Sequence, residues 1–148
     1  MAANPLVDQG SLNRVRGSVV IPNFSSLNVT AAFLGKQAIS LGLQGSAVTY
    51  IPTQTGAVTS PEPYMMVNCR VALLKTQALA GAYKSQMELD ARIGNYTVIP
   101  DASTLPNYSI VNGSIADIGE MSFAGEDPVY LVTLMGYYCV NSNLWNLL

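Results

Sequence analysis

Apolar side chains alternate with polar or small side chains along several stretches of this chain, and this alternation predicts half-buried β-strands. The clearest cases are residues 14–21, 37–44 and 64–74. In the third stretch the apolar face consists of Met65, Val67, Cys69, Val71 and Leu73. Residues 28–34 and 96–99 predict two shorter strands.

Two further stretches depart from simple alternation. In residues 107–118 the apolar positions change from even to odd numbers at Asn112-Gly113, which predicts a β-bulge. Residues 129–140 are apolar on both faces, as expected of a strand in the centre of a sheet.

One segment has the period of a helix. Leu79, Tyr83 and Met87 recur every four residues within 77–89, and Thr76 is a suitable N-cap. The whole pattern predicts an α+β fold that is mostly β, with two packed antiparallel sheets in a sandwich or open barrel. One flanking α-helix follows the fourth strand. The length of 148 residues corresponds to a single domain, residues 1–148.

Two segments fit neither period. Residues 45–63 are rich in Gly, Ser, Thr and Pro and carry one charge, Glu62, so they predict a long, ordered assembly loop. Residues 141–148 contain Leu and Trp and predict a C-terminal tail that docks on its own subunit or on a neighbour. The candidate inter-subunit residues of the loop are Tyr50, Ile51, Pro52 and Val58.

The composition points to self-association. The hydrophobic fraction is 49%, but only 11% of the residues are charged, against about 25% in ordinary domains. A near-neutral surface promotes association. The net charge of −2 argues against binding of duplex DNA through its phosphates. Residues 129–140 fall short of the roughly 20 that span a bilayer, and the first residues lack the pattern of a secretory signal. We therefore expect cytoplasmic synthesis and no membrane anchor.

The sequence predicts no enzyme activity, no catalytic, cofactor-binding or metal site, and no cofactor. It contains no histidine, only two cysteines, and no glycine-rich phosphate motif. Glu126 and Asp127 are adjacent, so on a strand they would point to opposite faces rather than form a dyad. Cys69 and Cys139 lie in apolar strands and predict buried, reduced thiols, with a disulfide as the alternative.

Several segments resemble the tail tube proteins of contractile-tailed bacteriophages. These are IPTQTG (51–56), SPEPY (60–64), LLKTQ (73–77), TVIPD (97–101), DPVY (127–130), GYY (136–138) and LW (144–145).

The resemblance implies a tail-tube-like fold of two packed β-sheets with a flanking helix. It also implies stacked hexameric rings whose joined strands surround a channel for DNA delivery, without tight DNA binding. The expected partners are other copies of the chain, a sheath, a baseplate and a tail terminator. The expected location is the tail of the virion, assembled in the host bacterial cytoplasm.

On this view strands 37–44 and 64–74 face the channel, which carries negative charge. The candidate channel-facing residues are Asn68, Arg70, Asp117 and Glu120. Arg70 would place a positive charge on a negatively charged channel wall. We therefore expect it to pair with Asp117 or Glu120, or else the opposite face of the strand lines the channel. Glu126 and Asp127 are further candidates for the negative charge.

Two alternatives remain open at this point. One is a monomeric or small-oligomer β-sandwich that binds, for example, carbohydrate, although the single tryptophan, Trp145, lies at the end of the chain. The other is the related tube of a tailocin-like or secretion device, which the sequence does not distinguish from a phage tube.

Overall fold

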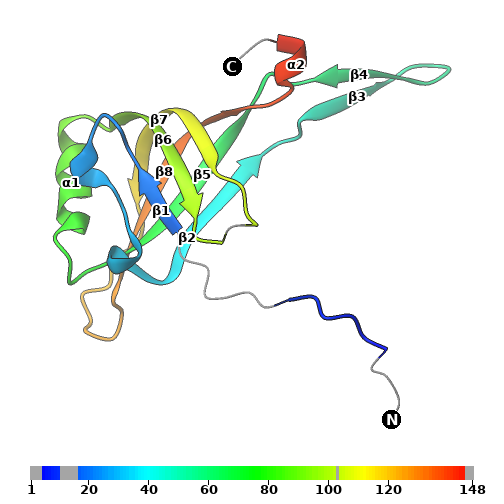
Figure 1. Ribbon diagram of the computed structural model, residues 1–148. Helices are drawn as coiled ribbons and strands as arrows, with labels where there is room; N and C mark the ends of the chain where they lie inside the picture. Colours follow the sequence, from blue (N-terminus) through cyan, green and yellow to red (C-terminus); the bar gives the residue numbers. More distant parts are fainter. Residues whose placement is uncertain (1–4, 11–16, 103, 146–148) are drawn as a thin grey trace.

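A six-stranded antiparallel sheet forms the centre of the computed structural model, which describes residues 5–10, 17–102 and 104–145 (Figure 1). Its strands, in spatial order, are β1 (Gly17–Val20), β6 (Arg92–Pro100), β7 (Tyr108–Ile118), β8 (Val129–Cys139), β5 (Tyr64–Leu74) and β2 (Leu34–Gln44). A second antiparallel sheet consists of β3 (Val48–Pro52) and β4 (Ala57–Pro61). The predicted α+β class, mostly β with two antiparallel sheets, is confirmed.

The large sheet curls into an open barrel. Its two edge strands, β1 and β2, approach each other without a backbone ladder between them. Gly17 allows this approach, because a Cβ atom there would lie 3.1 Å from Cδ1 of Ile39. The smaller sheet projects from one end of the barrel (Figure 1).

The core lies on the inner face of the barrel. In β5, Val67, Cys69, Val71 and Leu73 are all fully buried, which confirms the apolar face predicted for this strand. Helix α1 (Leu79–Leu89) packs against this core through Leu79, Ala80 and Tyr83. The Tyr83 hydroxyl donates a hydrogen bond of 2.7 Å to the carbonyl of Leu27, in the 3-10 turn η1 (Ser25–Leu27). The helix is thereby joined to the β1–β2 connection.

The start of the helix and its place in the order differ from the prediction. Helix α1 begins two residues later than expected, its N-cap is Ala78, and Thr76 does not cap it. The helix follows the fifth strand rather than the fourth. Residues 28–34 are not a strand: Val29 makes one bridge to Val19, and Ala31–Phe33 forms the 3-10 turn η2, since the chain must turn there to enter β2.

Residues 45–63 are also different from the prediction. They form the β3–β4 hairpin rather than an irregular loop, with Tyr50 opposite Thr59 and Ile51 opposite Val58. The turn is closed by a 2.8 Å hydrogen bond from the Thr53 amide to the Gly56 carbonyl. The β-branched residues favour strands, but both faces are exposed, so the sequence shows no alternation that would have revealed them.

The predicted bulge and the predicted central strand are confirmed. The register of β6–β7 and of β7–β8 shifts around Asn112 and Gly113, and Asn112 has a φ of 56°. Gly113 is required because the Tyr96 ring occupies the space that a Cβ atom would need. Strand β8 pairs with β7 on one side and with β5 on the other.

Candidate assembly surface

The β3–β4 hairpin, residues 48–61, is called the arm below, and it exposes the apolar residues predicted for inter-subunit contact. Tyr50 is 69% exposed, Ile51 51% and Val58 53%, and Pro52 is also exposed. Ile51 and Val58 are direct cross-strand partners, so their side chains lie together on one face. No residue of the arm is buried. The subunit alone therefore leaves these side chains in water.

The C-terminal segment contacts the base of the arm. The Asn141 side-chain amide donates hydrogen bonds to the carbonyls of Ala47 at 3.1 Å and Glu62 at 2.7 Å. The helical turn α2 (Ser142–Trp145) follows, with Leu144 64% and Trp145 46% exposed. The predicted tail thus contacts its own subunit through Asn141 while its large apolar side chains stay uncovered. Residues 146–148 of that tail lie outside the described part of the chain.

Strand β2 is a long edge of the sheet. Seven of its eleven residues have register partners in β5, with a shift between Leu34 and Ile39, and in the described part of the chain no strand pairs with its other side. Lys36 is its only charged residue. An extended edge with so little charge is a template for pairing with another strand.

The channel candidates of β5 and β7 share the outer face of the barrel. Arg70 is directly opposite Thr133 in β8, and Thr133 is directly opposite Asp117 in β7, so all three point outward. Asn68 lies on the same face of β5, and its buried Oδ1 atom has no hydrogen-bond partner. Glu120 lies beyond β7 and is exposed.

The ion pair expected for Arg70 does not form within the subunit. The described residues contain three ion pairs: Lys75–Asp127, Lys84–Glu88 and Asp90–Arg92. Arg70 and Asp117 are separated by the intervening strand β8. Both therefore keep an exposed charge that can meet a partner outside the subunit.

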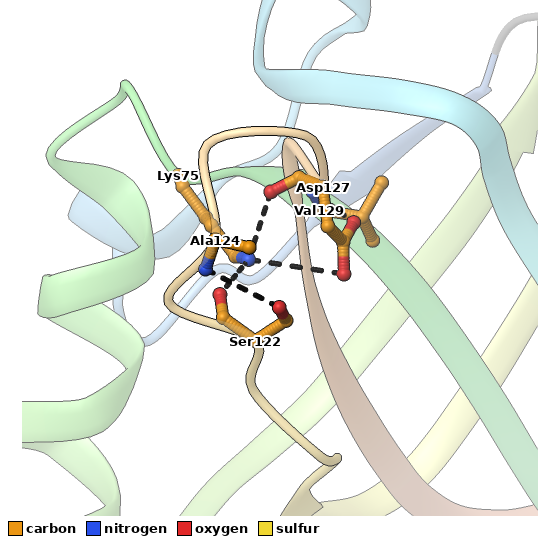
Figure 2. Close-up of polar contacts among 5 residues, drawn as sticks. All are labelled: Lys75, Ser122, Ala124, Asp127 and Val129. Carbon is orange, nitrogen blue, oxygen red and sulfur yellow. Dashed lines mark hydrogen bonds and ion pairs between the residues drawn. The ribbon is translucent and has the colours of Figure 1, made fainter.

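The loop between β7 and β8, residues 119–128, is organised by Lys75 (Figure 2). The Lys75 ammonium group donates to the carbonyls of Ser122 and Asp127, and it lies 3.8 Å from the Asp127 carboxylate. Asp127 also accepts a hydrogen bond of 3.1 Å from the Val129 amide. Its charge is thus compensated locally rather than free to line a channel.

The same loop holds an apolar residue that the sequence analysis missed. Phe123 is 95% exposed, and the loop that contains it lies at the end of the barrel away from the arm (Figure 1). Its neighbours Ser122 and Ala124 are small, so no periodic pattern marks it. The two ends of the subunit therefore both present uncovered apolar side chains.

The two cysteines are free and differ in environment. Cys69 is fully buried, and burial raises the pKa of its thiol to about 12. Cys139 is only half-buried, which corrects the expectation of two buried thiols. Cys69 is opposite Leu134, five residues before Cys139 on the neighbouring strand, roughly 17 Å away along it. A disulfide between them is therefore excluded.

We predict that one thiol per chain is labelled rapidly in the native, unassembled protein. Because the thiolate is the reactive form, Cys69 is almost unreactive at pH 8 on account of both its pKa and its burial. Cys139→Ser should abolish the rapid phase, as measured with a chromogenic disulfide reagent. Rapid labelling of Cys69 in that variant would contradict its placement in the core.

In residues 5–10, 17–102 and 104–145, no three of the Cys, Asp and Glu side chains gather closely enough to hold a metal ion. In the same part of the chain, none of the helices has the length and apolar character needed to cross a bilayer.

Comparisons with known proteins show a likeness of fold. No family model matches the chain, and no curated protein sequence matches it significantly. Among solved structures, it is similar to a chain in the cryo-EM structure of the anti-feeding prophage cap, described as the tube terminating cap, with a TM-score of 0.50 and 11% sequence identity. The match covers 93% of this chain and 97% of that chain. Over nearly its whole length, the protein therefore has the fold of a chain from a tube-terminating cap.

Proposed function

We propose that this protein is a non-enzymatic structural subunit of a phage-like contractile particle. In this proposal it associates with itself into stacked hexameric rings, which form the inner tail tube and conduct DNA. The observation that carries the proposal is the uncovered arm beside an edge strand that holds a single charged residue, Lys36. A second copy of the chain can cover both, and the fold likeness to a chain of a tube-terminating cap supports this choice of partner.

The arrangement of the exposed apolar side chains favours rings and stacks over a simple symmetric dimer. The arm lies at one end of the barrel, and the β7–β8 loop, which contains Phe123, lies near the other (Figure 1). If the arm contacts a different surface on the next copy, the contact is heterologous, and such contacts generate closed rings or continuing stacks. Pairing of the β2 edge with a neighbour would extend the sheet between subunits and remove the open edge.

The outer face of the barrel is suited to a passive channel wall. Among its residues in β2, β5, β7 and β8, the polar ones are mostly uncharged: Ser40, Gln44, Asn68, Ser114 and Thr133. Arg70 and Asp117 add one charge of each sign. Without a cluster of basic residues, this surface would not hold phosphates. A sheath, a baseplate and a tail terminator are the further partners implied for such a tube.

A carbohydrate-binding module is less well supported. The cavity at the β1–β2 seam is lined mainly by aliphatic side chains and prolines, and Tyr108 is its only aromatic residue. Trp145, the residue best suited to stack on a sugar ring, lies on α2 beside the arm rather than in that cavity.

We predict that the purified protein forms rings or tubes and that its melting temperature rises with protein concentration. Association buries edge and arm surface in the native state only, so mass action stabilises the folded form. Negative-stain electron microscopy and light scattering measure the assemblies, and thermal melts over a wide concentration range measure the stabilisation. A monomer mass together with a concentration-independent melt would contradict the proposed function.

A further inference from the structure

At the junction between the arm and the barrel, one side chain hydrogen-bonds to both ends of the arm. The Asn141 Nδ2 group donates to the Ala47 carbonyl at 3.1 Å and to the Glu62 carbonyl at 2.7 Å. Ala47 directly precedes β3, and Glu62 directly follows β4. A side-chain amide has two N–H donors, and here each is directed to one strand of the arm.

The backbone of Asn141 is shaped for this contact. Its φ is 55°, a left-handed conformation that non-glycine residues rarely adopt and that asparagine tolerates best. This conformation ends β8 and starts α2, where the Leu144 amide donates to the Asn141 carbonyl at 2.9 Å. Strained conformations of this kind persist where the surrounding structure requires them.

The other contacts at the junction do not tie both strands of the arm to the barrel. Gly45, with a φ of 85° and open space where a Cβ atom would stand, links β2 to the arm. The 2.8 Å bond from the Glu62 amide to the Ala47 carbonyl joins the two strands of the arm to each other, not to the barrel. The Val140 amide contacts the Pro63 carbonyl at 3.1 Å, on the β4 side alone. Asn141 therefore connects both strands of the arm to the end of β8.

We infer that Asn141 is a positioning residue for self-assembly, which sets the direction in which the arm leaves the barrel. The predicted effect on assembly rests on the proposed function. The effect on the direction of the arm can be measured in a monomer. In a ring, every subunit must present its arm in the docking direction. A free-energy cost of orienting the arm is therefore added once for each subunit. A small cost per chain becomes a large cost for the whole ring.

The decisive variant is Asn141→Gly, because glycine keeps the positive φ and removes only the side-chain amide. Spin labels at Thr59→Cys in the arm and Ser85→Cys in α1, in a Cys139→Ser background, report the direction of the arm by their distance distribution. We expect a broader distribution than in the otherwise identical protein with Asn141. We also expect an unchanged monomer melting temperature, together with loss of rings or tubes. Each hydrogen bond shifts the arm equilibrium about two- to tenfold per chain.

Two further variants make the test specific. Asn112→Gly is the matched control, since Asn112 also has a positive φ, of 56°, but lies in the bulge of β7. It should change neither the distance distribution nor assembly. Asn141→Asp keeps the size but places acceptors against two carbonyl oxygens, and it should broaden the distribution at least as much as Asn141→Gly.

The outcomes separate this inference from the proposed function. An unchanged distance distribution in Asn141→Gly would overturn the inference, as would a broadened distribution with normal assembly. A wild-type protein that stays monomeric would overturn the proposed function, and with it the role of Asn141 in assembly. In that case the distance measurement would still decide whether Asn141 holds the arm.

Discussion

Replacing residues 46–60 with a two-residue Asn-Gly turn is expected to abolish ring and tube formation while the barrel remains folded. No arm residue is buried, so the core loses no packing. The flanking strands keep their register, with Gln44 opposite Met66, and a short turn can close them as a hairpin. The expected effect is a change from assembled particles to monomers at the same protein concentration.

Circular dichroism checks the fold of the shortened chain, and sedimentation with electron microscopy checks its assembly. Tyr50→Ser with Val58→Ser is a milder variant that keeps the arm and removes its two most exposed large apolar side chains, so it should weaken assembly without shortening the chain. Normal tubes from the shortened chain would contradict the role of the arm. An unfolded chain would show that the arm supports the barrel after all.

Tyr83→Ala is expected to lower the free energy of unfolding of the subunit by about 3–5 kcal/mol. The Tyr83 side chain is fully buried between α1 and the sheet, and its hydroxyl holds the Leu27 carbonyl at 2.7 Å. The substitution leaves a large cavity and an unpaired carbonyl. Such a loss is a major part of the roughly 5–15 kcal/mol that stabilise a domain.

Urea denaturation of the monomer measures this loss. Of two further variants, the first isolates the contribution of the hydrogen bond, and the second is a control at an exposed position of the same helix. Tyr83→Phe removes only the hydroxyl and should cost about 1–3 kcal/mol, because the Leu27 carbonyl is left without a partner. Leu89→Ala, at the exposed end of the same helix, removes a side chain that is 85% exposed. If Tyr83→Ala destabilised the protein no more than Leu89→Ala, α1 could not be part of the core.

Strands with one buried face were predictable from the sequence, because burial imposes a period of two on the side chains. Strand β5 has the predicted bounds, residues 64–74, and the predicted buried face. The bulge at Asn112 was predictable for the same reason: an extra residue reverses the phase of burial, and the sequence shows that reversal. The central position of β8 follows from apolar residues on both of its faces.

The arm could not be recognised as a hairpin by the same method, because a strand pair with no buried face has no alternation to detect. The sequence determined which side chains the arm offers, namely Tyr50, Ile51 and Val58, and that its charge is low. The tertiary structure alone decided that Arg70 and Asp117 share a face and remain apart, since register between distant strands is set by packing of the whole sheet. It also decided the place of Asn141, which contacts Glu62 and Ala47, 79 and 94 positions earlier in the chain. Such contacts depend on where the barrel brings the chain back, and no local pattern encodes them.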